Sequence, residues 1–161
     1  MKNIIKLLLV SLTCMATACV SKESENCHLA IEFSNNSDMT LYVKDDSFYL
    51  VDSPDPFDIR KRSYFHPGQK NIKSHSVSKD AISSRNCWEY SFRSAIEMLY
   101  IYVFDAAVVE NTPWEVIARD YLVLKRYDLS LEDLQKLDWR VTYPPTDAMK
   151  DIKQYPPYGN N

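Results

Sequence analysis

Glycine is scarce in this 161-residue chain, which contains only Gly68 and Gly159. Phosphate-binding loops, dinucleotide fingerprints and the Gly-x-Ser-x-Gly nucleophile elbow each need glycines at fixed spacings. None of these motifs can be written in the sequence, which excludes the commonest nucleotide-binding and serine-hydrolase sites. Tight turns must instead use asparagine and aspartate, which tolerate a left-handed backbone better than other residues with a side chain.

Clustered positive charge and metal-ligand spacings are also missing. The only basic cluster is Arg60-Lys61-Arg62, and the formal net charge is −3, so a nucleic-acid partner is not expected. The three histidines, His28, His66 and His75, form no His-x-His or His-x₃-His pair, and no Cys-x₂-Cys occurs. We therefore expect no metal and no cofactor, and interpret His66 and His75 as surface residues of loops.

The one long apolar run lies at the start of the chain. Lys2 and Lys6 precede or interrupt an apolar stretch ending near Leu12. A membrane-spanning helix needs roughly 20 apolar residues, so this run is too short to span a bilayer and has the length of a signal-peptide core. Residues 1–18 are predicted to be a signal peptide.

Small residues follow the apolar run and end at a cysteine. Ala16-Thr17-Ala18-Cys19 resembles the lipobox of bacterial lipoproteins, which implies cleavage before Cys19 and lipidation of that cysteine. Cys14 fits the pattern less well, and a soluble secreted protein cut nearby is the alternative. Residues 19–27 are predicted to be a flexible tether. Glu23 and Glu25 resemble acidic surface-export signals, but a plain linker is the preferred interpretation.

The chain after the signal is long enough for one domain. Residues 19–161 carry 17 basic and 22 acidic residues, a formal charge of −5, and one core is expected within residues 28–145. If Cys19 is lipidated, Cys27 and Cys87 remain. Outside the cytoplasm they are predicted to form a disulfide, and two free thiols are the alternative.

Apolar residues alternate with polar ones along much of the domain, which predicts strands. Residues 28–33 and 39–44 are predicted to form a hairpin around the turn Asn35–Asp38, with a second turn at Asp45–Ser47. Residues 99–104 are apolar on both faces, which indicates a central strand. A short apolar piece lies at residues 48–51, and further strands are expected at residues 121–127 and 139–143. Residues 71–80 have little strand character, and residues 146–161 are predicted to be an irregular tail rich in proline and tyrosine.

Short helices are expected between the strands. One covers residues 87–96, one residues 112–120 with a capping box from Thr112 and Glu115, and one begins at Ser130. The predicted fold is mostly β, an antiparallel β-sandwich with two or three short helices in the connections. The alternative is an α+β fold with helices on one face of an antiparallel sheet.

The second half of the chain carries a family resemblance. The segments Phe104-Asp105-Ala106, Pro113-Trp114, Leu124–Leu134 and Trp139–Pro144 are similar to those of small uncharacterised lipoproteins of Bacteroides-type bacteria. The resemblance covers most of the chain after the signal. It implies a cell-envelope lipoprotein and brings no assigned activity.

Candidate functional residues are few. The carboxylates Asp105, Glu110, Glu115 and Asp120 surround the predicted central strand and the helix after it, and Asp105 is the best of them for hydrolysis. A turn or helix cap is its alternative role. The eleven tyrosines and three tryptophans are expected mainly in the core, with Tyr155 and Tyr158 as candidates for stacking on sugars or a protein.

The sequence favours a non-enzymatic lipoprotein of the outer membrane that binds an envelope protein or glycan through its β-rich domain. It is attached to the membrane by a lipid anchor at Cys19. A small envelope hydrolase that uses a carboxylate is the second hypothesis. A structural subunit of an outer-membrane assembly is the third.

Overall fold

The computed structural model describes residues 24, 26–49 and 71–159. The predicted signal peptide, Cys19 and His66 lie outside the described residues, as do residues 50 and 51 of the short apolar piece. The strands are β1 (Ala30–Asn35), β2 (Leu41–Tyr49), β3 (Asn71–Ile72), β4 (Ser76–Ser83), β5 (Ile96–Asp105), β6 (Lys125–Leu129), β7 (Arg140–Tyr143) and β8 (Lys153–Tyr155). The helices are α2 (Trp88–Ser94), α3 (Ala106–Asn111), α4 (Trp114–Asp120) and α5 (Leu131–Lys136), with a 3₁₀ turn η2 (Asp147–Met149).

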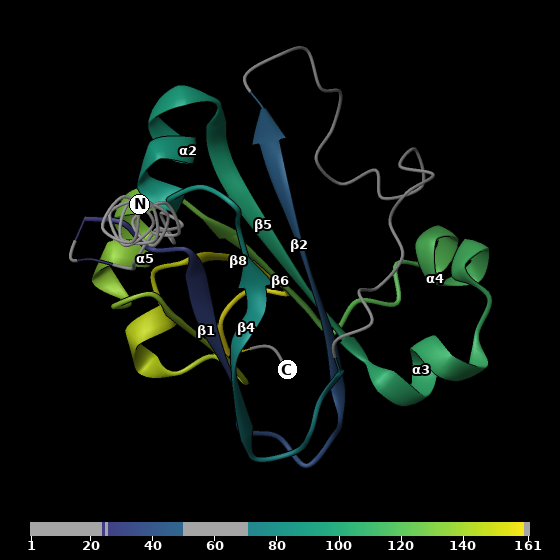
Figure 1. Ribbon diagram of the computed structural model, residues 1–161. Coiled ribbons are helices and arrows are strands. Elements are labelled where there is room, and N and C mark those ends of the chain that lie inside the picture. Colours follow the sequence, from purple (N-terminus) through teal and green to yellow (C-terminus); the bar gives the residue numbers. More distant parts are fainter. Residues whose placement is uncertain (1–23, 25, 50–70, 160–161) are drawn as a thin grey trace, which may run out of the picture.

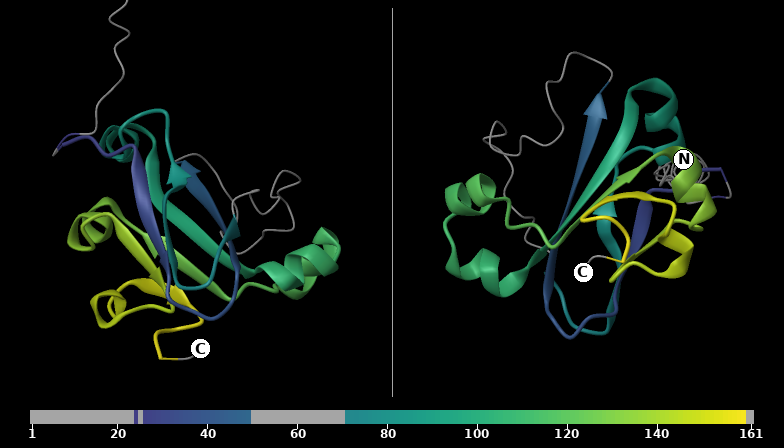
Figure 2. Two further views of the ribbon diagram at one scale, coloured as in Figure 1. Left: turned by 60° about the horizontal axis from the view of Figure 1, so that its bottom comes forward. Right: turned by 180° about the vertical axis from the view of Figure 1, so that it is seen from behind.

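The strands form two sheets, which confirms the predicted β-sandwich (Figures 1 and 2). The smaller sheet has the order β4-β1-β7 and the larger has the order β3-β2-β5-β6-β8. All pairs are antiparallel except β1 with β7, which is parallel. The helices lie in the connections, and the described part of the chain holds four, one more than the upper limit predicted.

The main core lies between the two sheets. Alternate residues of β1, including Ile31 and Phe33, face Leu99, Ile101 and Val103 of β5, and all of them are fully buried. The predicted central position of the apolar strand is confirmed, since β5 pairs with β2 on one side and β6 on the other.

The opposite face of β5 packs against a second, smaller core. Tyr100, Tyr102 and Phe104 lie there beneath α4, which contributes Ile117 and Ala118. Helices α3 and α4 therefore stand on the far side of the large sheet from β1, as Figure 1 shows. This arrangement explains why both faces of β5 are apolar.

The predicted hairpin between residues 28–33 and 39–44 is wrong. Both segments are strands, but β1 pairs with β4 and β7, while β2 pairs with β3 and β5 in the other sheet. The alternation shows that one face of each strand is buried against the core, and it does not show which strand is the hydrogen-bonded neighbour. The period-two pattern therefore cannot distinguish a hairpin from two strands in different sheets.

The side chain of Asn35 stabilises the segment in which the chain passes from β1 of the small sheet to β2 of the large sheet. Its amide nitrogen donates to the carbonyls of Met39, Ile72 and Lys73 at 2.7, 3.1 and 2.9 Å. Its oxygen accepts from the backbone N–H and the hydroxyl of Ser37 at 3.0 and 2.7 Å. The residue is fully buried, so these partners replace water completely.

Asn35→Ala is expected to lower the free energy of unfolding by about 2 kcal/mol, because three backbone carbonyls, one of them in a buried contact, lose this donor. Chemical denaturation measures the change. Asn36→Ala is the matched control, since Asn36 is exposed, and it should leave the unfolding midpoint near that of the wild type. Equal loss in both variants would contradict the role given to Asn35.

Three further local predictions fail because sheet pairing overrides local propensity. The turn expected at Asp45–Ser47 is strand, paired in register with Leu99–Ile101 of β5. Residues 76–83 form the full strand β4, whose polar side chains suit a position at the sheet edge. The tail predicted to be irregular contains β8, which pairs with β6.

The helix starts also differ in part from the prediction. Ser130 and Asp133 form a capping box at α5, as its sequence indicates. The capping box expected from Thr112 does not form, because α4 begins after Pro113 without a side-chain cap. The helix that was not predicted, α3, is capped by Asp105, which accepts from the backbone N–H of Ala107 at 2.9 Å.

Candidate functional site

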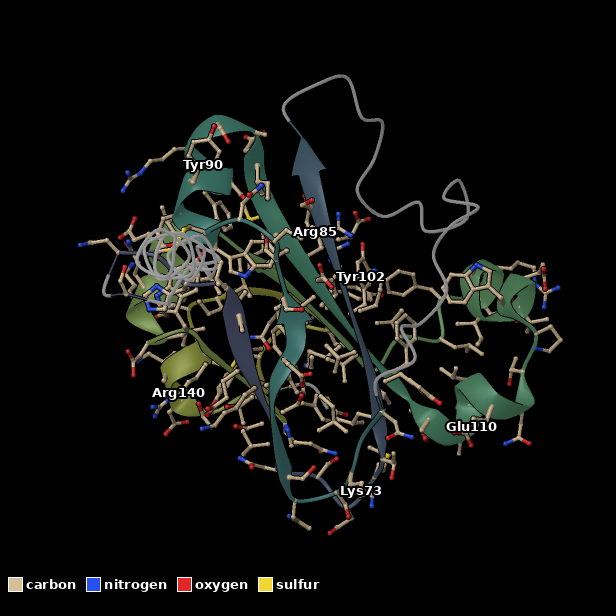
Figure 3. All side chains as sticks on the ribbon, in the orientation of Figure 1. Lys73, Arg85, Tyr90, Tyr102, Glu110 and Arg140 are labelled. Carbon is tan, nitrogen blue, oxygen red and sulfur yellow. A yellow bond between two sulfur atoms is a disulfide. The ribbon has the colours of Figure 1, made fainter. Side chains whose placement is uncertain are left out.

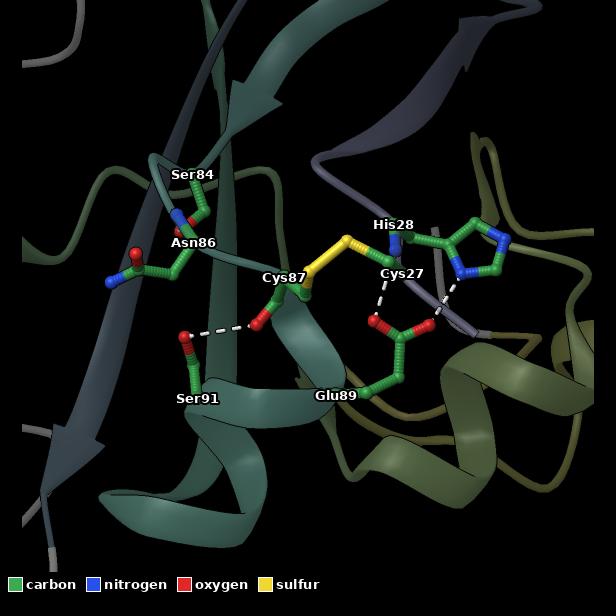
Figure 4. Close-up of a disulfide and its surroundings, with 7 residues drawn as sticks. All are labelled: Cys27, His28, Ser84, Asn86, Cys87, Glu89 and Ser91. Atoms are coloured by element: carbon green, nitrogen blue, oxygen red, sulfur yellow. Dashed lines mark hydrogen bonds and ion pairs between the residues drawn. A yellow bond between two sulfur atoms is a disulfide. The ribbon is translucent and has the colours of Figure 1, made fainter. Parts of the chain in front are cut away.

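A disulfide between Cys27 and Cys87 confirms the predicted cysteine pair and organises the surrounding site (Figure 4). The two Cα atoms are 4.8 Å apart and the cysteines are separated by 60 residues. Cys27 lies just before β1 and Cys87 is the residue before α2. The bond therefore links the segment just before β1 to the N-terminal end of α2.

His28 is held by three contacts with that helix. Its backbone N–H donates to Glu89 Oε2 at 2.9 Å, and its carbonyl accepts from the N–H of Trp88 at 2.8 Å. Its ring Nδ1 lies 2.5 Å from Glu89 Oε1 (Figure 4). A carboxylate at Nδ1 keeps the proton on that nitrogen, so Nε2 of the neutral ring is an acceptor.

Glu89 is ionised in this arrangement although it is only 5% exposed. Burial by itself raises the pKa of its carboxyl, but the hydrogen bonds from the side chain and backbone of His28 outweigh burial. The net pKa of Glu89 is therefore lowered. A carboxylate held in this state orients the imidazole and is a poor proton donor.

The stability that Glu89 contributes should be lost in acid. Because its folded-state pKa is depressed below the unfolded value of 4.5, its contribution is complete above that value and disappears as the pH falls through the lower, folded one. Denaturant unfolding between pH 3 and 7 measures the free energy of unfolding of the wild type and of Glu89→Gln. The difference between the two proteins should become smaller at the acid end. The exposed Glu97→Gln is the control, and a difference independent of pH would contradict the prediction.

Trp139 forms the other wall beside His28. The two rings are stacked, with centroids 4.2 Å apart and planes at 15°. Asp138 and Trp139 both adopt left-handed backbone conformations, with φ of 50° and 57°. A bulky residue in that region costs on the order of 1–3 kcal/mol and persists only where its surroundings hold it.

The end of α5 holds this backbone. The N–H of Trp139 donates to the carbonyl of Leu134 at 2.9 Å, and its own carbonyl accepts from Glu32 in β1 at 2.9 Å. A glycine usually ends a helix in this way, but this chain has only two. The aspartate and tryptophan that replace it place an aromatic side chain where a glycine would leave none.

A pocket of about 300 Å³ opens on the outer face of the small sheet next to the stacked rings. Its lining includes His28, Glu32, Lys79, Asp138, Trp139 and Arg140. Arg140 Nε lies 3.7 Å from Glu32, and its Nη2 lies 3.7 Å from Asp138. Figure 3 shows Arg140 on the side of the molecule away from Glu110 of α3.

The carboxylates singled out in the sequence do not come together in this pocket. Asp105 serves as the cap of α3. Glu110 accepts from Tyr42 Oη at 3.3 Å, and Asp120 pairs with its neighbour Arg119 at 2.7 Å on the surface. Glu115 is exposed in the first turn of α4. Asp105 therefore has the cap role that was its alternative.

The predicted histidines and aromatics divide between surface and core. His75 is exposed and pairs with Asp38 at 2.8 Å. Trp88 and Trp139 are buried as expected, while Tyr155 and Tyr158 are 47% and 38% exposed. Within residues 24, 26–49 and 71–159, no three side chains of histidine, cysteine, aspartate or glutamate are placed to hold a metal.

A buried ion pair lies on the far face of the large sheet. Arg126 and Asp128 on β6 are each 1% exposed. The guanidinium donates from Nε and Nη2 to the two carboxylate oxygens at 2.7 and 3.0 Å, and it lies 5.5 Å from the ring centre of Tyr100. Lys153 Nζ adds a contact of 3.4 Å to Asp128. Burial raises the pKa of the neighbouring Tyr102 hydroxyl, which favours its protonated form beside the ion pair.

Comparison with known proteins finds no matching family model, no matching curated protein and no matching solved structure. Among the helices described, none has the length and apolar character needed to cross a bilayer.

Sequence reasoning missed the pairing of His28 with Glu89, although a signal was present. His28 follows Cys27 directly, and Glu89 lies two residues after Cys87. A disulfide between the cysteines brings these residues within reach of each other. The Lys79 and Arg140 contributions could not be found this way, because the β4-β1-β7 strand order was not predicted.

Proposed function

We propose that this protein is a cell-envelope lipoprotein, anchored through Cys19, whose folded domain is a non-enzymatic binding module. The lipobox-like Ala16-Thr17-Ala18-Cys19 and the short signal before it support the address. The Cys27–Cys87 disulfide fits a compartment beyond the cytoplasm, where such bonds persist.

The pocket beside His28 carries the proposal. It is placed on regular strands and on a helix end, and the disulfide, the Glu89 contacts and the Trp139 stack fix its walls. Rigid walls reduce the entropy lost on binding, which is what a binding site requires. Cys87 is in a disulfide and Asp105 caps a helix, so neither is available as a nucleophile.

One preparation tests both the address and the binding role. The full chain is purified from its own membranes, co-purifying molecules are identified by mass spectrometry, and the mass of the N-terminal peptide is measured. We expect an acylated Cys19 and a partner that is lost when Arg140 is changed to glutamine. An unmodified N-terminus would overturn the anchor, and a partner unaffected by Arg140→Gln would remove the pocket from the proposal.

A small hydrolase is the second candidate, favoured by the imidazole of His28 oriented by a carboxylate. Such a pair can act as a general base on water. Turnover of ester or glycoside substrates that is abolished in His28→Gln would favour it. Binding without turnover supports the module.

A further inference from the structure

We propose that the pocket beside His28 binds a zwitterionic lipid headgroup in which a phosphate and a primary ammonium are joined by a short link, as in phosphoethanolamine. This rests on the binding function proposed above and names the ligand class of the same site.

Both signs of charge meet on three adjacent strands. Glu32 is on the middle strand β1, while Lys79 is on β4 and Arg140 begins β7. Arg140 is the registered partner of Glu32 across the parallel pair, and Asp138 lies just before it. A ligand of one sign meets like charge in this pocket, whereas a ligand with both signs finds an opposite charge for each of its groups.

The charged groups are available to a ligand. Both contacts of Arg140 to carboxylates are 3.7 Å, too long for hydrogen bonds, and its side chain is 63% exposed. Lys79 makes no ion pair with any of residues 24, 26–49 or 71–159. A phosphate can therefore take the guanidinium fork and the lysine without breaking a strong bond.

The carboxylates then select the amine. Glu32 and Asp138 are acceptors for N–H donors, which a primary ammonium has and a quaternary ammonium lacks. Phosphoethanolamine can satisfy them, and phosphocholine cannot. Nε2 of His28 adds an acceptor at the wall formed by the stacked rings.

The position of the pocket indicates a membrane source for this headgroup. His28 is nine residues after Cys19, and nine residues reach at most about 30 Å. The pocket residues His28 and Glu32 lie just before and on β1. Strand β1 lies on the opposite side of the large sheet from α3 and α4 (Figure 1). A domain anchored at Cys19 therefore carries the pocket within reach of the headgroups of its own membrane.

The test uses the full acylated chain in a non-ionic detergent. Isothermal titration compares four probes, which are phosphoethanolamine, phosphocholine, glycerol phosphate and short-chain phosphatidylethanolamine. We expect phosphoethanolamine to bind about tenfold more tightly than phosphocholine or glycerol phosphate, since each of these lacks one of the paired contacts. The short-chain lipid should bind at least as tightly as the free headgroup.

Two variants and their controls localise the binding. Arg140→Gln and Glu32→Gln should each weaken phosphoethanolamine about tenfold, through loss of the phosphate and ammonium contacts respectively. Arg119→Gln and Glu115→Gln make the same charge changes on α4 and should leave the affinity unchanged. Circular dichroism of each variant checks that it is folded.

The possible results distinguish the headgroup ligand from the more general binding function. Equal binding of glycerol phosphate, or no effect of Glu32→Gln, overturns the zwitterionic ligand. Binding of the free headgroup but not of the lipid overturns the membrane source. If no probe binds while a glycan or protein is captured through Arg140, the headgroup inference fails and the binding module stands. If nothing binds or is captured, both fail.

Discussion

Asp128→Ala is expected to lower the free energy of unfolding by about 3 kcal/mol, because two charge-assisted hydrogen bonds inside the protein are lost and water does not replace them. The guanidinium of Arg126 would keep its 1% exposure and lose both hydrogen bonds to the carboxylate. It would also lose the nearby negative charge that Lys153 shares. Urea unfolding followed by far-ultraviolet circular dichroism measures the change.

The control is Asp120→Ala, which removes a carboxylate from an ion pair of similar length on the surface. Arg119 and Asp120 are 2.7 Å apart but are 66% and 44% exposed. Water solvates both charges there, so the unfolding midpoint should not move. Replacement of the buried pair together, as Arg126→Met with Asp128→Leu, should recover most of the loss. Equal effects of the two aspartate variants would show that burial does not strengthen the inner pair.

Reduction of the Cys27–Cys87 disulfide is expected to cost about 4 kcal/mol of stability, on the chain-entropy estimate for a loop of this length. The bond closes a loop of 60 residues in sequence, and opening it increases the freedom of the unfolded chain. The same loss is expected for Cys27→Ser with Cys87→Ser. Thermal and denaturant unfolding, with and without reductant, measure both.

The serine variant is its own control for the reductant. Dithiothreitol should destabilise the wild type and leave the double serine variant unchanged. The bond should also affect the pocket, because His28 is next to Cys27 and its ring stacks on Trp139. Loss of the bond should change the tryptophan fluorescence of the native state. If stability falls without that change, the disulfide does not position the pocket wall.

The class of fold could be predicted from the sequence, whereas the strand pairing could not. Period-two patterns correctly placed β1, β5 and β7 because a half-buried strand leaves that pattern wherever it pairs. The partner of β1 depends on which edge or face covers it, and that is decided by residues far along the chain. Polar β4 escaped detection because an edge strand needs little apolar surface.

The candidate site, like the fold, could be predicted only in part. Cysteine counting predicted the disulfide, since a lipidated Cys19 leaves one pair in the domain. It did not indicate that the residues next to each cysteine, His28 and Glu89, would form a hydrogen-bonded pair. The left-handed backbone at Trp139 could not be predicted either, because it depends on where α5 ends. Only then is it clear that a residue other than glycine must adopt this conformation.

The strand order of the small sheet also has a consequence for how the chain can be made. Residue Glu32 of β1 is in register with Arg140 of β7, so about 100 residues must be synthesised before the pair can form, and closing so long a loop is slow. Synthesis runs from the N-terminus, and β4 is available earlier than β7. An incomplete chain therefore holds β1 with one edge open. An open strand edge can pair with another chain, and Ile31 and Phe33 of the same strand are apolar, so we expect this strand to promote aggregation of the unfinished protein.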